Sequence, residues 1–102
     1  MFMIDVLVWW HMESEMRAVV SGRVQLVMYR DFTCRAAKRF GLVGTVRNLR
    51  DGTVEVVAQG DTKKLEHFVS TLRRGSPLSR VDGVEVEWRT PSKDFKIFSI
   101  IF

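Results

Sequence analysis

The sequence predicts an α+β sandwich in which two helices cover one face of an antiparallel sheet. The chain has 102 residues, which leaves room for one domain. Segments with alternating hydrophobic residues are interleaved with two segments of helical period, and glycine or Asp-Gly turn signals separate them. Hydrophobic residues make up 46% of the chain and charged residues 27%, which is typical of a protein that folds around its own core.

The first predicted unit is a strand, a loop and a helix. Residues 17–24 alternate and are rich in β-branched side chains, which favours a strand. The alternation breaks in the segment GRVQLVMYR (22–30), and a helical period begins at residue 31 and continues to residue 41. Gly41 is suited to end this helix because glycine adopts a left-handed conformation without strain. The helix is therefore expected to begin directly after an irregular loop.

The middle of the chain predicts a hairpin followed by a second helix. Residues 42–48 and 53–60 read as strands, and the Asp-Gly pair at 51–52 supplies the turn chemistry between them. Asp61 is a suitable N-cap for the helix that follows, and Gly75 is suited to close it. The two strands are expected to pair antiparallel, with the helix crossing over afterwards.

Two strands complete the predicted fold. Residues 84–88 alternate hydrophobic side chains with glutamate, and residues 96–102 form a final apolar strand. The order is βαββαβ plus one C-terminal strand, and right-handed crossovers put both helices on one face of the sheet, the ferredoxin-like arrangement. We expect residues 12–102 to form this single domain and residues 1–11 to be an apolar extension or a misassigned start.

The N-terminal segment carries no sign of export or membrane anchoring. Residues 1–11 are apolar, but they lack a basic leader, contain Asp5 and fall short of the roughly 20 residues of a membrane span. An added edge strand or a tail that binds a partner remains the alternative for this segment. The single cysteine, Cys34, cannot form an internal disulfide, which favours a reducing compartment and hence the cytoplasm.

The net charge and the available side chains restrict the classes of ligand and of catalytic site that this protein can have. A net charge of +4 favours anionic ligands, and nucleic acid, phosphate esters and anionic lipid all fit it. The two histidines, His11 and His67, have no plausible catalytic triad, and the strand glutamates fall on the polar face rather than in facing pairs. The spacing of the His and Cys residues predicts no metal site, and we expect no cofactor.

The loop before the first helix suits an anion. A loop that enters a helix leaves several backbone N–H groups unpaired, and the helix dipole adds partial positive charge there. Arg30 stands at this junction, and its planar guanidinium can bind two phosphate oxygens while staying protonated. On the residues alone, this pattern indicates anion binding and nothing more specific.

Two motifs add a family resemblance. The segment G-R-V-Q-L-V-M-Y-R (22–30) resembles the G-x-V-Q-G-V-x-F-R cradle of the acylphosphatase family, and G-T-V-R-N-L-R-D-G-T-V (44–54) resembles its second signature. The resemblance extends from about residue 17 to the C-terminus. It implies that Arg30 is the phosphate-binding arginine and Asn48 the residue that positions the attacking water.

The resemblance implies hydrolysis of acyl phosphates to a carboxylate and inorganic phosphate. A carboxylate leaving group, with a pKa of about 4, departs without a general acid or a metal ion. Positioning and stabilised charge on the phosphoryl oxygens are then the main requirements, and backbone N–H groups of the loop can supply them. The expected substrate-binding residues of this loop are Gln25, Leu26, Val27, Met28 and Tyr29.

Leu26 departs from the family pattern, which has glycine there. If this position requires a positive φ, leucine costs roughly 1 kcal/mol or more, and its side chain can narrow or cap the site. A catalytically impaired phosphate-binding or regulatory domain is therefore one alternative. An RNA-binding module is another, but the central strands lack the aromatic residues it needs. We expect a monomer that binds neither nucleic acid nor membrane.

Overall fold

The computed structural model describes residues 14–91 and 93–102, so the prediction for residues 1–11 lies outside the described part. Within these ranges, no helix combines the length and apolar character that crossing a membrane requires. The elements, in chain order, are β1 (Ser14–Arg23), α2 (Tyr29–Arg39), β2 (Val43–Asn48), β3 (Val54–Gly60), α3 (Thr62–Arg74), β4 (Arg80–Arg89) and β5 (Phe98–Ile100).

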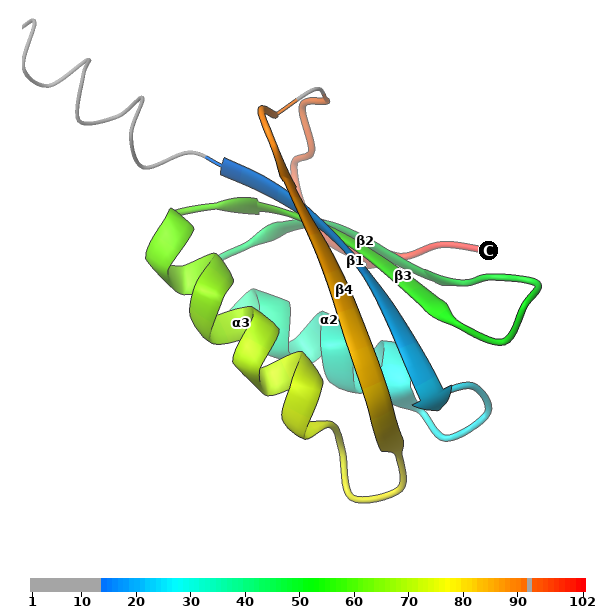
Figure 1. The fold of residues 1–102 in the computed structure, drawn as a ribbon. Coiled ribbons are helices and arrows are strands. Elements are labelled where there is room, and N and C mark those ends of the chain that lie inside the picture. The colour runs from blue at the N-terminus through cyan, green and yellow to red at the C-terminus, as the bar shows by residue number, and fades with distance from the viewer. Residues whose placement is uncertain (1–13, 92) are drawn as a thin grey trace, which may run out of the picture.

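The five strands form one sheet, and both helices pack on the same face of it (Figure 1). The strand order is β4-β1-β3-β2-β5, with β1 and β3 in the middle. β1 pairs antiparallel with β3 and with β4, and β2 pairs antiparallel with β3. The predicted ferredoxin-like α/β sandwich is therefore confirmed, including the crossover after each of the first and third strands.

The sheet is mixed rather than purely antiparallel, which corrects one detail of the prediction. β5 pairs parallel with β2, with Gly44 opposite Phe98 and Val46 opposite Ile100. β4 runs antiparallel to β1, so a chain that leaves β4 and crosses that end of the sheet must return in the direction of β1 and β2. β5 is also shorter than the predicted 96–102, because the crossing uses the residues before Phe98.

The predicted helix ends are largely confirmed by their hydrogen bonds. Asp61 caps α3, since its Oδ1 accepts a hydrogen bond from the backbone N–H of Lys63 at 3.0 Å. Gly41 follows α2 with a φ of 70°, the left-handed conformation that glycine adopts without strain. α2 itself begins at Tyr29, two residues earlier than expected, so Arg30 lies inside its first turn.

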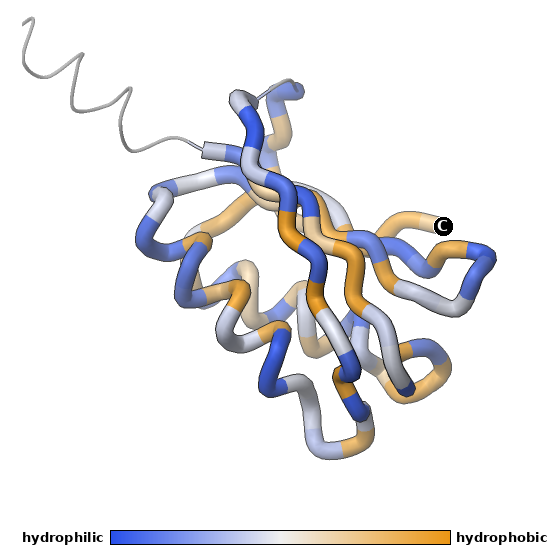
Figure 2. Tube along the Cα trace, viewed as in Figure 1, coloured by the Kyte–Doolittle hydropathy of each residue, from blue (hydrophilic) through white to orange (hydrophobic). Residues whose placement is uncertain are grey.

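The core lies between the helices and the sheet, where alternate strand residues point inward. Met16, Ala18 and Val20 of β1 are fully buried, and Phe68 of α3 packs against this layer. Figure 2 shows hydrophobic positions along the inner faces of both helices. Cys34 is buried on α2, and its thiol donates to the carbonyl of Phe98 at 3.6 Å.

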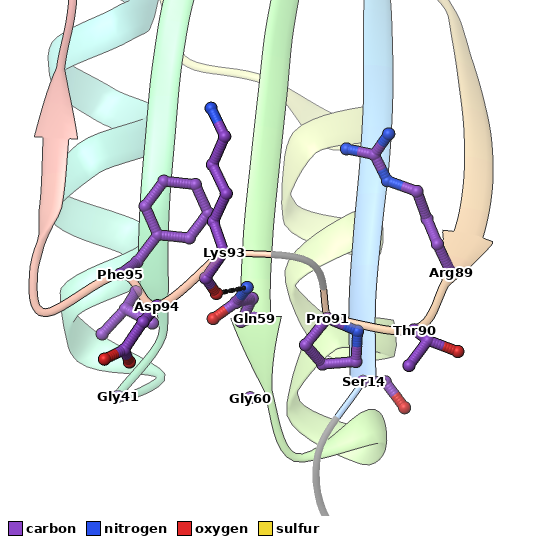
Figure 3. Close-up of a pocket in the computed structure, with 11 residues that line it drawn as sticks. Ser14, Gly41, Gln59, Gly60, Arg89, Thr90, Pro91, Lys93, Asp94 and Phe95 are labelled. Atoms are coloured by element: carbon purple, nitrogen blue, oxygen red, sulfur yellow. Dashed lines mark hydrogen bonds between the residues drawn. The ribbon is translucent and has the colours of Figure 1, made fainter.

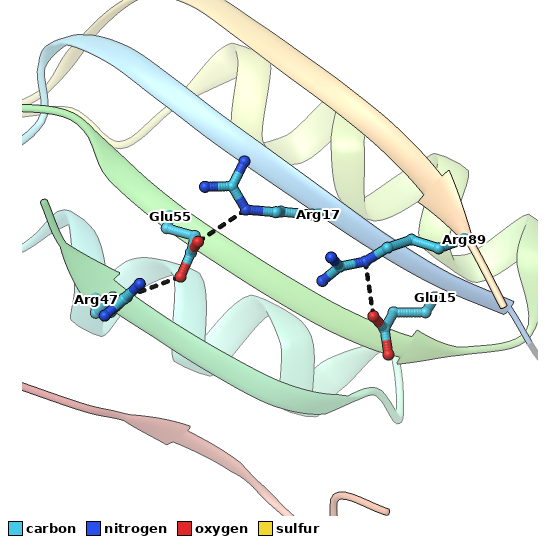
Figure 4. A network of polar contacts seen from close by, with 5 residues as sticks. All are labelled: Glu15, Arg17, Arg47, Glu55 and Arg89. Carbon is cyan, nitrogen blue, oxygen red and sulfur yellow. Dashed lines mark hydrogen bonds and ion pairs between the residues drawn. The ribbon is translucent and has the colours of Figure 1, made fainter. Parts of the chain in front are cut away.

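The other face of the sheet carries ion pairs (Figure 4). Glu55 on β3 binds Arg17 of β1 and Arg47 of β2, each through the arginine Nε at 2.8 Å. Glu15 at the start of β1 is almost fully buried, and it pairs with Arg89 of β4 at 2.8 Å. These contacts join strands that lie side by side and so add to the backbone pairing of the sheet.

We expect Glu55→Gln to lower the free energy of unfolding at pH 7 by about 1 kcal/mol, because two charge-assisted hydrogen bonds weaken. Burial alone would raise the pKa of Glu55, but the hydrogen bonds and charges of Arg47 and Arg17 outweigh it and hold that pKa below its usual value. A lowered folded-state pKa stabilises the protein above the unfolded-state pKa, and this contribution disappears as the pH falls through the folded-state value.

Urea unfolding at pH 7 and at pH 3 measures this effect. The difference in the free energy of unfolding between wild type and Glu55→Gln should be smaller at pH 3 than at pH 7, because protonation of Glu55 in wild type removes its charge. Asp82→Asn is the matched control, because the Arg80–Asp82 pair is exposed and should contribute little at either pH. A constant difference between wild type and Glu55→Gln at both pH values would contradict the assignment to the charge of Glu55.

Candidate active site

The loop between β1 and α2 has an unusual backbone. Leu26 has a φ of 64° and Met28 a φ of 62°, so both non-glycine residues adopt the left-handed conformation. Residue 26 was predicted to be strained if it required a positive φ, and the structure shows that φ with leucine in place. Each such residue costs roughly 1 kcal/mol or more. Strain held at two loop positions is typical of a functional segment.

The N–H groups of this loop are free to bind a ligand. None of the backbone N–H groups of residues 25–28 donates a hydrogen bond to another described residue. The first bond into α2 runs from the N–H of Phe32 to the carbonyl of Met28, so the N–H groups at the start of the helix are also without a helical partner. Left-handed residues in such a loop turn successive N–H groups toward one concavity, which suits an anion.

Arg30 lies at the edge of this concavity. It is partly exposed in the first turn of α2, and its Cζ lies 5.1 Å from the centroid of the Phe102 ring. This distance is within the range of a cation–π contact, and the guanidinium still carries N–H donors that can bind phosphate oxygens. A hollow of about 340 Å³ surrounds the group and is lined by Val24, Leu26, Met28, Tyr29, Arg30, Asp31, Ile100 and Phe102.

Asn48 is the last residue of β2, and its side chain carries an unused acceptor. Its Oδ1 atom is buried and has no hydrogen-bond donor among the described residues. An unpaired buried acceptor costs about 1–3 kcal/mol, so its presence calls for an explanation other than packing. An amide oxygen held in this way can accept a hydrogen bond from a water molecule, as the family resemblance implies.

Gln25 connects the loop to the hairpin that holds Asn48. Its Nε2 donates to the carbonyl of Leu49 at 2.8 Å and to that of Thr53 at 2.9 Å. Leu49 directly follows Asn48, so the amide of Gln25 braces the strand end from which Asn48 projects. The side chain of Gln25 is thereby occupied, and only its backbone N–H remains for a ligand.

The end of β5 brings Phe102 to the same place. Its parallel pairing with β2 ends at Val46 opposite Ile100, and Phe102 lies two residues beyond this pair. Figure 1 shows the C-terminus beside the β2–β3 hairpin, at the end of the sheet where the β1–α2 loop also lies. Arg30 and Asn48 therefore lie at one end of the molecule, with Phe102 linking their two elements.

The side chains of two other predicted site residues point toward the protein core rather than toward the ligand site. Tyr29 is buried, and its hydroxyl donates to the carbonyl of Leu72 at 2.9 Å, so the hydroxyl has the partner that its burial requires. Burial raises the pKa of Tyr29, which keeps it protonated. Val27 packs against the core. These residues can contribute backbone N–H groups to a ligand, while their side chains fix the loop.

Sequence reasoning missed Phe102 and Glu15. Phe102 was assigned to a strand, and only the parallel pairing of β5 reveals that the chain end lies on Arg30. Glu15 preceded the predicted first strand, but β1 begins at Ser14 and buries Glu15 among polar partners. The alternating pattern starting at Glu15 was a usable signal, although the charge of this residue obscured it.

A hollow of about 690 Å³ lies at the opposite end of the sheet (Figure 3). It is lined by the start of β1, the ends of β3 and β4 and the segment before β5, and it contains none of the predicted site residues. The backbone of Lys93 closes part of it by accepting a hydrogen bond from Gln59 at 2.7 Å. Among the described residues, no group of three His, Cys, Asp or Glu side chains is placed to hold a metal ion.

Comparisons with known proteins agree with the geometry. The acylphosphatase family model matches residues 16–100. An acylphosphatase of Dehalococcoides mccartyi is 45% identical over 86 residues, which cover 83% of this chain and 94% of that protein. An acylphosphatase of Methylococcus capsulatus is 42% identical over 88 residues, which cover 86% of this chain and 96% of that protein.

A comparison of folds with a solved structure also identifies an acylphosphatase as similar. The crystal structure of acylphosphatase from Bacillus subtilis superposes with a TM-score of 0.85 at 36% identity, and the match covers 87% of this chain and 99% of that one. Sequence and fold therefore agree over most of the chain. The chain belongs to the acylphosphatase family.

Proposed function

We propose that this protein hydrolyses the carboxyl-phosphate bond of acyl phosphates, with Arg30 and the β1–α2 loop holding the phosphoryl group and Asn48 positioning the attacking water. The observation that carries this proposal is the loop itself. Its N–H groups at residues 25–28 have no partner among the described residues, and its two strained residues turn the loop into a concavity next to an arginine. Family membership identifies the kind of anion.

The reaction needs only groups that this site offers. A water oxygen forms a bond to phosphorus while the bond from phosphorus to the carboxylate oxygen breaks, giving a carboxylate and inorganic phosphate. The guanidinium of Arg30 and the loop N–H groups stabilise charge on the equatorial phosphoryl oxygens. The carboxylate, whose conjugate acid has a pKa of about 4, leaves without protonation.

Asn48 supplies position rather than proton transfer. Its Oδ1 accepts a hydrogen bond from the water, and its amide N–H group can donate to the substrate, which aligns the water for in-line attack. An amide is not a base, so the water's proton goes to a phosphoryl oxygen of the substrate. The bracing of this strand end by Gln25 keeps the water and the phosphoryl group at a fixed separation.

Hydrolysis of benzoyl phosphate in ¹⁸O-labelled water tests the proposal. We expect turnover well above the spontaneous rate, competitive inhibition by inorganic phosphate, and ¹⁸O in the phosphate product only, because attack occurs at phosphorus. Label in benzoate would indicate attack at the carbonyl carbon and would contradict the mechanism. Phosphate binding without turnover would favour the alternative of an impaired, regulatory domain.

The finer expectations from the sequence are also part of this proposal. A carboxylate leaving group supports a reaction without metal or other cofactor. The absence of aromatic residues from β1 and β3 supports a domain that binds no nucleic acid through its open face. The buried, unpaired Cys34 supports a cytoplasmic location. We also propose that the protein acts as a monomer, with residues 12–102 as its single domain.

A further inference from the structure

The β1–α2 loop and Arg30, which we call the phosphate cradle, have an apolar mouth. Leu26 is 98% exposed, Met28 is 67% exposed, and Phe102 is fully exposed, yet all three line the same hollow as Arg30. We call these three side chains the apolar rim. Figure 2 shows the β1–α2 loop as hydrophobic where it protrudes from the sheet. Large apolar side chains gathered at a ligand site, rather than scattered over a surface, mark a contact surface.

The rim cannot be explained by the packing of the protein. Leu26 and Met28 hold their side chains outward from strained left-handed positions, where glycine or asparagine would fit at lower cost. Neither side chain is buried, so packing in the core does not offset the free-energy cost of the backbone strain. A side chain that is strained, apolar and exposed at a binding site is best explained by contact with a ligand.

The cradle determines which part of a substrate meets the rim. In the proposed function, the loop N–H groups and the Arg30 guanidinium hold the phosphoryl group, and the Phe102 ring lies 5.1 Å from the Arg30 Cζ. Since the cradle encloses the phosphoryl group, the acyl group must extend through the mouth between Leu26, Met28 and Phe102. Asp31 lines the same hollow and disfavours acyl groups that carry a further negative charge.

We propose that the apolar rim makes this enzyme selective for acyl phosphates with a bulky apolar acyl group, aromatic or branched aliphatic, over those with a small or charged one. The inference rests on the proposed function, because that function fixes the phosphoryl group in the cradle. The sequence motifs contain no residue that would recognise the acyl group. The exposed apolar side chains at the mouth of the cradle provide that recognition.

The selectivity test compares benzoyl phosphate with acetyl phosphate. The variant Leu26→Asn/Met28→Asn removes apolar surface and keeps the backbone, because asparagine tolerates the left-handed conformation. We expect the ratio of kcat/KM for the two substrates to fall about tenfold, equal to about 1.4 kcal/mol, which is what burying roughly one face of a phenyl ring contributes. The intrinsic reactivity of each substrate cancels in this comparison.

Ile97→Asn is the matched control. Ile97 is 67% exposed, as Met28 is, but it precedes β5 at the far end of the sheet from the cradle. We expect the control to leave the ratio unchanged. A ratio that changes less than twofold in Leu26→Asn/Met28→Asn, or as much in Ile97→Asn, would overturn the inference.

A binding measurement separates this inference from the proposed function. Calorimetry with phenylphosphonate and methylphosphonate, which the enzyme cannot hydrolyse, should show tighter binding of phenylphosphonate to wild type and loss of that preference in the rim variant. If wild type lacks turnover but shows this pattern, the proposed hydrolysis is wrong, while the contact of the rim with the organic group of a bound phosphoryl ligand is retained. If turnover is normal and neither measurement depends on the rim, only the inference fails.

Discussion

Arg30→Ala should lower kcat/KM for benzoyl phosphate by about a thousandfold or more, because the guanidinium is the charged group placed to bind two phosphoryl oxygens at once. Binding of inorganic phosphate, measured by calorimetry, should weaken strongly in the same variant. Arg30→Lys keeps the charge but loses the planar pair of donors, so we expect an intermediate loss. We therefore expect kcat/KM for benzoyl phosphate to decrease in the order wild type, Arg30→Lys, Arg30→Ala.

Arg35→Ala provides the matched control for this loss. Arg35 lies on the same helix, its exposed side chain pairs with Asp31 at 3.0 Å, and it does not line the hollow around Arg30. Removing it should change kcat/KM less than threefold, as expected for an exposed ion pair. Equal losses in Arg30→Ala and Arg35→Ala would mean that general positive charge, rather than the Arg30 guanidinium, attracts the substrate.

Asn48→Ala should reduce kcat about a hundredfold to a thousandfold while leaving phosphate binding nearly intact, because in the proposed mechanism Asn48 aligns the water rather than the phosphoryl group. The same variant should not unfold more easily than wild type. The buried Oδ1 has no donor among the described residues, so truncation removes an unpaired acceptor and its cost. Rate assays, phosphate calorimetry and urea unfolding measure the three effects.

Asn48→Asp tests the role of the amide more closely. A carboxylate of the same shape still accepts hydrogen bonds from water, but it places negative charge near an anionic substrate and loses the N–H donor. We expect low kcat together with weaker phosphate binding. If Asn48→Ala keeps wild-type kcat, or loses stability and phosphate affinity together, the assignment of Asn48 to water positioning is wrong.

The element order of this protein could be read from its sequence because local signals determine it. Asp61 and Gly41 are placed where a cap and a left-handed residue are needed, and both act as predicted. The partner of β5 could not be read in the same way. A strand that returns after β4 pairs antiparallel at the β4 edge of the sheet or parallel at the β2 edge, and the edge it reaches depends on tertiary contacts such as the one between Cys34 and Phe98.

The candidate site was only partly accessible to sequence reasoning. Arg30 and Asn48 carry motif signals, and local physics supports Arg30 independently as a residue at a helix start. The contact of Phe102 with Arg30 depends on a parallel register, and the exposure of Leu26 depends on a loop conformation that apolar residues rarely adopt. Neither follows from composition or periodicity, because both arise where distant segments meet.

The two hydrogen bonds from Gln25 also bear on the motion of the site. Because the amide joins the β1–α2 loop to the carbonyls of Leu49 and Thr53, we expect a displacement of the loop to carry the hairpin with it. In the proposed mechanism, such a shared displacement preserves the alignment of the water with phosphorus. That alignment then depends on a pair of hydrogen bonds between two surface segments.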